Sequence, residues 1–400
     1  MNVLLLIMDS VRAKNTSLHG HSRDTTPYLD RFAEECQVYT QARSPSRWSI
    51  PSHASIFTGE HVLEHGVTDI GDKLPPGETV FSTLNEAGYD TAVFSRNSFL
   101  TLDKTGLNTD FQTVEPLRDP PFPNGVNPAI YSETSTFLRN ALNTAPVRSL
   151  LNAGIVKLSW DFPHRTPRRI RELCPRLKPD RKYVSAFLDW IDGRNTWAAC
   201  VNLVGAHGPL RPTRSHWESP DARAAEKDAA TPWDFYEGIH PWETLEGFED
   251  LYDESLLDVD TQIERIIERL RETGELEDTL VVITSDHGEG FGAPDPLRDD
   301  VRICGHTPGT HEHLFHVPLL VYHPAITPEK IRRPVTLTEF SDVVGEAISG
   351  HEPSFGDMDV WAFDVGDIPG RTTPEYVDED EYTISSEQRR CTMNPQRVRT

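Results

Sequence analysis

Two segments far apart in the chain place acidic side chains at the ends of apolar runs. Residues 3–8 are apolar and lead into Asp9, and residues 280–284 lead to Asp286 and His287. Short, β-branched apolar runs of this kind are typical of buried strands. In α/β sheets, the carboxyl ends of the strands are where ligands bind. Carboxylate oxygens with one imidazole nitrogen suit Mn²⁺ or Zn²⁺, so we predict one divalent metal ion held by these side chains.

A hydroxyl nucleophile is predicted at Ser49. Pro51 opens a short apolar segment that ends in Thr58-Gly59, and proline suits the first turn of a helix. Free backbone N–H groups at a helix N-terminus favour an anion and would help to lower the pKa of the Ser49 hydroxyl. A metal ion bound to the same oxygen would lower it further, so Ser49 is also a predicted metal ligand. The alternative is that Ser49 is an ordinary helix cap.

The elements that must position these groups alternate along the chain, which predicts a doubly wound α/β sheet. Further strands are expected at 90–95, 197–204 and 317–322, and helices from Thr26-Pro27, over 79–87 and over 253–272. We predict a catalytic domain over residues 1–350 with irregular insertions at about 116–182 and 212–250. Residues 351–400 are predicted to be an acidic C-terminal appendage or tail.

The net charge of −24 excludes some classes of partner. An acidic surface disfavours nucleic acid and anionic membranes, and it indicates a salt-adapted source. Residues 165–182 form a basic island, which either contacts an anionic partner or is a solvated helical segment.

Five scattered cysteines argue against a disulfide framework. The apolar start is interpreted as a strand and not a signal peptide, and no stretch approaches the roughly 18–20 apolar residues of a membrane span. We therefore expect a cytoplasmic enzyme, with its oligomeric state open.

Asp9, the Ser-x-Pro-Ser element at Ser49 and residues 285–289 together resemble the sulfatase branch of the alkaline phosphatase superfamily. Residues 25–30, 202–209 and 316–321 match further stretches of that family in the same order. The resemblance covers most of residues 1–325. It implies a central, mostly parallel sheet flanked by helices, and a metal-dependent sulfuric ester hydrolase. The substrate that it implies is an anionic ester, small or of a sugar or glycan.

The nucleophile position follows from the spacing to Thr58-Gly59, which puts Ser49 in that position and His53 in that of the family's arginine. Pro45-Ser46-Arg47 imitates the same signature, but would make Arg43 the nucleophile. The resemblance implies that Ser49 could be converted to formylglycine. However, His53 departs from the motif, and Ser10 replaces a second aspartate. The ligand set also resembles that of lipoteichoic acid synthases, which use an unmodified hydroxyl with Mn²⁺ or Zn²⁺. Oxygen-rich sulfatase sites prefer Ca²⁺, which stays open.

The resemblance also implies the residues around the anion. His207 and His306 are the predicted catalytic histidines, and a downstream histidine of this kind protonates the leaving alkoxide. His311 is an alternative to His306, which Gly305 favours because it allows close backbone approach. The predicted substrate-binding residues are His53, Asn97, Arg96 and His311, with Arg12 as a further anion clamp.

Three functions remain open from the sequence. The leading one is a metal-dependent, sulfatase-like hydrolase of an anionic ester. The second is a phosphoester hydrolase or phosphotransferase that uses unmodified Ser49, which His53 and the Asp-His pair favour. The third is a non-catalytic scaffold that binds an anion or a metal, because Ser10 and His53 replace two of the family's functional residues.

Overall fold

An eight-stranded sheet forms the centre of the protein. The computed structural model describes residues 1–102, 105–115, 122, 124–126, 134–161, 179–213, 217, 232–295, 301–306, 309–356, 361–363 and 391–393. In spatial order the strands are β11 (Glu329–Ile331), β2 (Gln37–Tyr39), β10 (Leu319–Tyr322), β7 (Thr279–Thr284), β1 (Asn2–Met8), β6 (Trp197–Leu203), β4 (Asp90–Ser95) and β5 (Thr113–Val114). Only β10 runs antiparallel to its neighbours in this sheet. The predicted α/β class with a mostly parallel sheet is confirmed.

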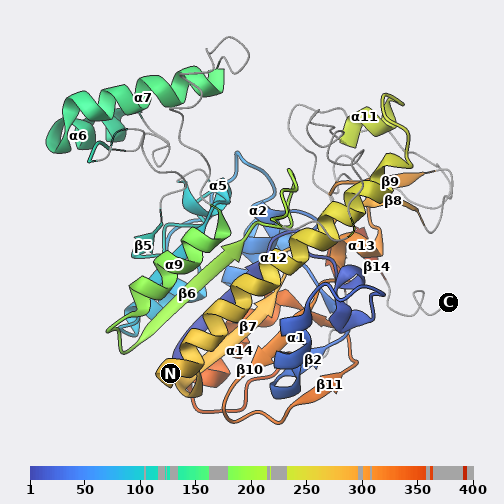
Figure 1. The fold of residues 1–400 in the computed structure, drawn as a ribbon. Helices are drawn as coiled ribbons and strands as arrows, with labels where there is room; N and C mark the ends of the chain where they lie inside the picture. Colours follow the sequence, from blue (N-terminus) through green and yellow to red (C-terminus); the bar gives the residue numbers. More distant parts are fainter. Residues whose placement is uncertain are drawn as a thin grey trace.

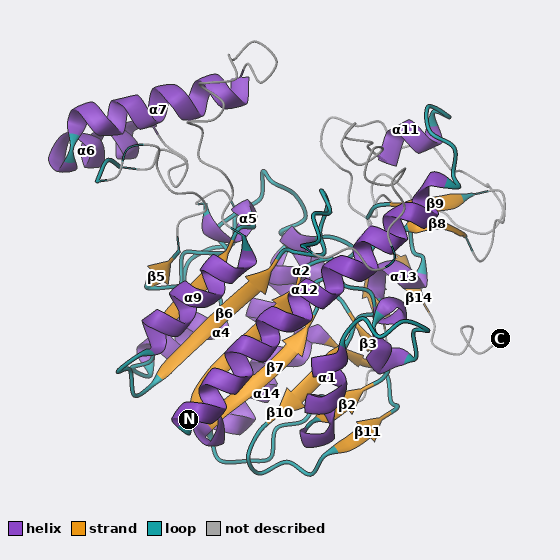
Figure 2. Ribbon diagram, viewed as in Figure 1, coloured by secondary structure: helices purple, strands orange, loops and turns teal. Residues whose placement is uncertain are grey.

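The apolar run of β1 is explained by burial on both faces of the sheet. Val3, Leu5 and Ile7 pack into one core, while Leu4, Leu6 and Met8 pack into the other. Side chains of a strand alternate between faces, so a strand covered on both sides is apolar at every position. The first core also contains side chains of α2 (Ser49–Thr58), α4 (Val80–Glu86) and α14 (Phe340–Ile348), and the second contains those of α1 (Pro27–Phe32), α9 (Asp180–Ile191) and α12 (Thr244–Thr273). Figures 1 and 2 show these two helical layers.

The long helix α12 begins earlier than the sequence predicted. A start at residue 253 was expected, but α12 begins at Thr244 and therefore includes the last residues of the predicted insertion 212–250. The physical reason is that Leu245, Phe248 and Tyr252 continue the buried apolar stripe upstream at helical spacing. Gly274, with a φ of 76°, ends the helix where it was predicted to end.

The remaining elements are short or stand apart from the sheet. Helices α6 (Thr134–Thr144) and α7 (Pro146–Asp161) project beyond it (Figure 1). The others are α3 (Val62–His65), α5 (Ser98–Thr101), α11 (Pro232–Tyr236), α13 (Glu312–Phe315), β3 (Ala42–Arg43), β12 (Val335–Thr336), β8 (Phe291–Pro294), β9 (Arg302–Cys304), β13 (Trp361–Phe363) and β14 (Cys391–Met393). Single 3₁₀ turns cover Ala13–Asn15, Ser17–His19, Ala33–Glu35, Glu275–Asp278 and Leu337–Glu339.

Parts of two sequence predictions fall outside the described residues. Most of the basic island lies there, as does most of the predicted appendage at 351–400. No helix in the described part of the chain is long and apolar enough to cross a membrane. The cytoplasmic location and the salt-adapted source stay predictions.

Candidate metal centre and active site

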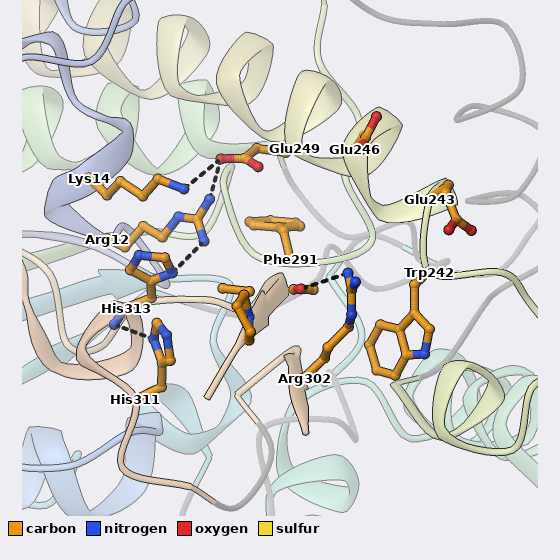
Figure 3. A pocket seen from close by; sticks show the side chains of 13 residues that line it. Arg12, Lys14, Trp242, Glu243, Glu246, Glu249, Phe291, Arg302, His311 and His313 are labelled. Atoms are coloured by element: carbon orange, nitrogen blue, oxygen red, sulfur yellow. Dashed lines mark hydrogen bonds and ion pairs between the residues drawn. The ribbon is translucent and has the colours of Figure 1, made fainter. Parts of the chain in front are cut away.

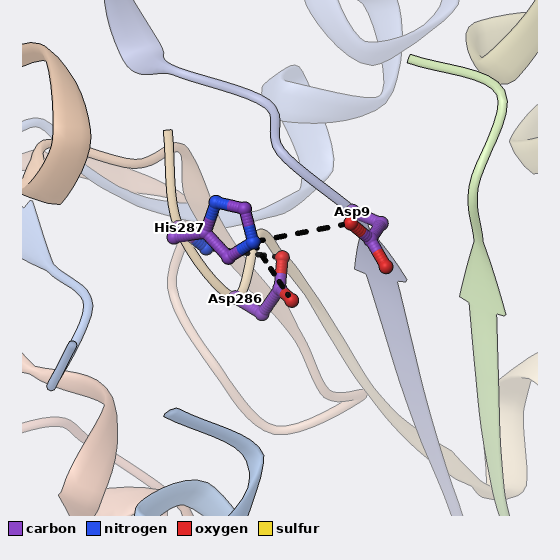
Figure 4. A group of neighbouring side chains, drawn as sticks. All are labelled: Asp9, Asp286 and His287. Atoms are coloured by element: carbon purple, nitrogen blue, oxygen red, sulfur yellow. Dashed lines mark hydrogen bonds and ion pairs between the residues drawn. The ribbon is translucent and has the colours of Figure 1, made fainter. Parts of the chain in front are cut away.

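Strand register brings the two acidic segments together. β1 and β7 are parallel neighbours in which Ile7 lies opposite Thr284, so Asp9 and Asp286 both lie two residues beyond that pair. Asp9, Asp286 and His287 each offer one ligand atom, and these three atoms lie within 4.8 Å of one another. All three side chains are fully buried. Figure 4 shows them converging on one point at the carboxyl edge of the sheet. This is the arrangement that a single metal ion requires.

His287 presents its Nε2 atom to the two carboxylates. Its Nδ1 lies 2.8 Å from the carbonyl oxygen of Gly288, which fixes the proton on Nδ1 and leaves the Nε2 lone pair free. Nε2 lies 3.5 Å from Asp286 Oδ2 and 4.0 Å from Asp9 Oδ1. Burial, assisted by the charge of nearby His306, lowers the pKa of His287 to about 3. The imidazole is therefore neutral, which is the form that binds metals.

Hydrogen bonds hold Asp9 in place from β6 and from the segment that follows β4. Asn202 and Asn97 each donate from Nδ2 to Asp9 Oδ2, at 3.1 and 3.0 Å. On the other side, the backbone N–H of Ser10 donates to Asp286 Oδ1 at 3.1 Å. Ser10 has a φ of 65°, so its backbone turns sharply to bring that N–H between the two acids. Asp9 is thus held through Oδ2, and Asp286 through Oδ1, before any ligand binds.

Ser49 is the first residue of α2, at the position that its spacing to Thr58-Gly59 predicted. The hydroxyl is buried and lies 3.4 Å from His287 Nε2. The N-terminus of α2 therefore faces the Asp9–Asp286–His287 group, and its partial positive charge favours an anion there.

His53 lies one turn along α2 from Ser49 and is fully buried. Its Nδ1 lies 2.8 Å from the carbonyl oxygen of Ser49 and 3.5 Å from Asp286 Oδ2. The Nε2 atom has no hydrogen-bond partner among the described residues. The ring also packs edge-on against Phe57. His53 thus lies beside the acidic group and not at the surface of its helix.

Two further histidines complete the open side of the site. The His306 ring lies 4.7 Å from that of His287 and 5.3 Å from that of His207. Glu289 Oε2 lies 3.2 Å from His306 Nδ1. Burial alone would lower the pKa of His306, but the Glu289 carboxylate, with Asp9 and Asp286 further away, raises it above its ordinary value. His306 is therefore more easily kept protonated than His287.

Arg96 and His311 make their polar contacts with residues outside this group. Arg96 donates to the carbonyl oxygen of Val204, and its Nε lies 3.7 Å from Asp180 Oδ1. His311 caps α13 with its ring 4.3 Å from that of His313. Both histidines line a different pocket of about 470 Å³ (Figure 3). Of the two downstream histidines that the sequence offered, His306 is the one beside the Asp9–Asp286–His287 group.

Arg12 lines that same pocket and contributes to the structure there. Its side chain is 1% exposed, is paired with Glu249, and donates to Asn15 Oδ1 at 2.5 Å and to the Glu289 carbonyl oxygen at 3.1 Å. The sequence predicted that Arg12 is an anion clamp, but in the structure its guanidinium forms an ion pair with Glu249 that is buried on the arginine side.

Sequence reasoning missed three residues near the site. Asn202 orients Asp9, and Glu289 holds His306. Arg47, the arginine of the misleading Pro-Ser-Arg triplet, is fully buried, and its Nη1 lies 3.5 Å from the carbonyl oxygen of His306. The signal for Asn202 was an isolated polar residue inside an otherwise apolar strand, because such a residue needs a buried partner.

Comparison with known proteins gives one consistent result. A family model described as sulfatase matches residues 1–348. An arylsulfatase of Clostridium perfringens is 22% identical over 343 residues, which are 81% of this chain and 68% of that enzyme. YhbX of Escherichia coli, whose name suggests a transferase, is 26% identical over 26% of this chain, and the match spans only 18% of that protein. The structure of a phosphonate monoester hydrolase of Agrobacterium radiobacter superposes with a TM-score of 0.62 at 19% identity, covering 92% of this chain and 81% of that one.

Proposed function

Because the chain belongs to the sulfatase family, we propose that it is a metal-dependent hydrolase of an anionic ester, with sulfate esters as the first substrate class. One observation carries the proposal. A buried group of two carboxylates and one neutral imidazole lies at a sheet edge, with the Ser49 hydroxyl 3.4 Å from that imidazole. Neither a helix cap nor a structural ion pair requires this combination of groups.

The donor set fits a divalent cation. Two buried carboxylates repel each other, and Asp286 Oδ2 has no hydrogen-bond partner among the described residues. A cation would remove both costs. Asp9, Asp286 and His287 would bind it, with Ser49 as a fourth ligand. The mixed oxygen and nitrogen set favours Mn²⁺ or Zn²⁺, and Ca²⁺ is the alternative. When bound, the ion would polarise the ester and lower the pKa of the hydroxyl.

The remaining steps use the chain's own residues. The Ser49 hydroxyl gives up its proton to solvent water, and its oxygen attacks sulfur, or phosphorus in a phosphoester, as the bond to the leaving oxygen breaks. We assign His306 as the acid that protonates that oxygen, because Glu289 keeps its pKa high. His207 is the second catalytic histidine and faces the same space. Water then attacks the covalent ester, releases the inorganic anion and restores the Ser49 hydroxyl.

The predicted substrate-binding residues differ in the roles that we propose for them. His53 keeps an unpartnered Nε2 near the acids, and we propose it as a contact for the anion. Asn97 already donates to Asp9, so its proposed role is to position that ligand. Arg96 and His311 have their contacts elsewhere, and the proposal gives them no part in the chemistry.

A second candidate is a phosphoester hydrolase or phosphotransferase with unmodified Ser49. His53 in place of the family's arginine favours it, because that departure alters the motif associated with conversion to formylglycine. The mass of the peptide that contains Ser49 separates the two mechanisms, since oxidation to the aldehyde removes two hydrogens.

Parallel assays test the proposal directly. The metal-depleted protein is given Mn²⁺, Zn²⁺ or Ca²⁺ and is assayed with an aryl sulfate and the matching aryl phosphate. We expect turnover that depends on added metal and a clear preference for one ester. No turnover of either ester with any of these ions, in protein shown to bind metal, would contradict the proposal.

A further inference from the structure

A third apolar cluster lies apart from the two cores of the sheet. Phe235 of α11, Leu245 and Phe248 of α12, and Cys304 of β9 pack together with less than a tenth of each side chain exposed. Most of these residues come from the predicted insertion 212–250 and from the start of α12, which extends beyond the sheet in Figure 1. This cluster does not close on itself, because it lines one wall of a cavity of about 410 Å³.

The same cavity reaches the catalytic histidines. Ala206 and Gly208, which flank His207, line it together with Gly305, which precedes His306, and Glu289, which binds His306. Gly305 has a φ of 65°, and a Cβ atom there would lie 2.7 Å from Pro232 Cγ. The loop that carries His306 therefore packs directly against the insertion. One end of the cavity is formed by residues that flank His207 and His306, and the other is an apolar wall.

Because one cavity borders both the histidine segments and the apolar wall, we propose that it binds the leaving group of the ester. We propose that this leaving group is apolar: an aryl or short alkyl alcohol. The inference rests on the proposed function and adds the substrate class. The leaving oxygen would lie beside His306, and the carbon skeleton would lie against Phe235, Leu245 and Phe248.

The chemistry of the wall distinguishes this class from a sugar. A sugar presents a hydroxyl on nearly every carbon, and each hydroxyl needs a partner when it leaves water. The wall formed by Phe235, Leu245, Phe248 and Phe291 offers no side-chain donor or acceptor. Its polar lining is at the histidine end, with Glu289, and at Arg211, which is exposed. A volume of about 410 Å³ is within the range of small-molecule sites.

The first experiment compares esters of 4-alkylphenols from methyl to pentyl. Lengthening the alkyl group hardly changes the basicity of the leaving oxygen, so the series isolates apolar contact. Using whichever ester type the enzyme hydrolyses, we expect kcat/KM to rise by about fourfold per buried methylene and to fall once the cavity is full. The 4-hydroxymethyl ester should be a poorer substrate than the 4-ethyl ester of the same size. A flat series, or equal rates for that pair, overturns the inference.

Matched variants place the effect in the cavity. Phe248→Leu enlarges the cavity and should move the preferred alkyl chain to a longer member. Phe111→Leu makes the same change at a similarly buried phenylalanine in the first sheet core and should leave the preference unchanged. Because the readout is the ratio between substrates in one preparation, partial loss of folded protein does not affect it. An unchanged preference in Phe248→Leu, or the same shift in both variants, overturns the assignment.

Failure of the proposed function is distinguishable from failure of this inference. If no ester is hydrolysed, the proposed function is wrong, and equilibrium dialysis with free 4-butylphenol still tests the cavity. Saturable binding that Phe248→Leu alters and Phe111→Leu does not would support it. No saturable binding, or an equal effect of the two changes, would overturn it.

Discussion

Two groups of charged residues and histidines differ in charge balance. In the metal centre, two carboxylates and a neutral imidazole are fully buried. In the neighbouring pocket, Arg12, Lys14 and Arg302 face Glu243, Glu246 and Glu249 (Figure 3). The pocket therefore balances three cations with three carboxylates. The Asp9–Asp286–His287 group has an excess of negative charge, which a bound cation would neutralise.

The comparison shows that clustering alone does not identify a functional site. A balanced cluster lowers the cost of burying its charges through its own ion pairs. An unbalanced one keeps that cost unless a ligand neutralises it, so its ligand contributes to stability as well as to chemistry. Removing a carboxylate should therefore have opposite effects on the stability of the metal-free protein in the two regions.

Asp286→Asn should have the largest effect on catalysis. Loss of one metal ligand should lower kcat/KM by more than about 10³-fold, because both the ion and the activated hydroxyl are lost. The metal-free variant should nevertheless be at least as stable as the metal-free wild type, because one of two repelling charges is gone. Metal content and urea unfolding measure the two effects. Turnover comparable to that of wild type would refute the metal assignment.

Ser49→Ala should separate chemistry from metal binding. We expect kcat to fall by about 10³-fold, the scale of losing a covalent nucleophile, while most of the bound metal remains on Asp9, Asp286 and His287. Steady-state kinetics and metal analysis of the same preparation measure this. Rates equal to those of wild type would show that the covalent mechanism is wrong.

Asn202→Leu should have an intermediate effect. The substitution removes one of the two amides that orient Asp9, and loss of such a supporting group typically costs about 10–100-fold in metal affinity or activity. Titration of the metal-free variant with Mn²⁺ and Zn²⁺ gives the affinity. Asn97→Leu removes the other amide and is the matched comparison. An affinity unchanged in both variants would show that these amides do not set the ligand geometry.

Glu249→Gln should change catalysis least and should act on stability instead. Arg12 would lose its charged partner in a buried position, which should lower the free energy of unfolding by about 1–3 kcal/mol, since Glu249 is itself partly exposed. We expect kcat/KM to stay within about tenfold of wild type. A large loss of activity with unchanged stability would contradict the contrast between the two regions.

The same variant should also change the pH dependence of stability. Burial opposes ionisation of Glu249, but Arg12 and Asn15 together lower its pKa below the ordinary value of 4.5. A carboxyl with a depressed pKa in the folded state stabilises the protein above its unfolded pKa and loses that contribution as the pH falls through its folded pKa. Wild type should therefore lose more stability than Glu249→Gln below about pH 4.5. Denaturant unfolding between pH 3 and pH 7 measures this difference; parallel curves would show that the ion pair contributes nothing.

The sequence by itself determined the elements and the identity of the family. Residues 3–8 and 280–284 are apolar at nearly every position because a sheet covered on both faces needs no polar side, and this makes both strands and their terminal acids visible from composition alone. Pro51 also placed Ser49 at the start of a helix, where the structure has it. These features depend on residues that are close together in the sequence, so the sequence pattern alone predicts them.

Only the tertiary structure decided which polar side chains meet. The sequence could not choose firmly between His306 and His311, because both follow β7 in the same loop-rich segment; Glu289 and the packing of Gly305 against Pro232 decide it. It gave no role to Asn202, whose partner Asp9 is 193 residues away. It also could not show that Arg12 is neutralised by Glu249. Such contacts depend on strand register and on loops from distant segments, which no period along the chain encodes.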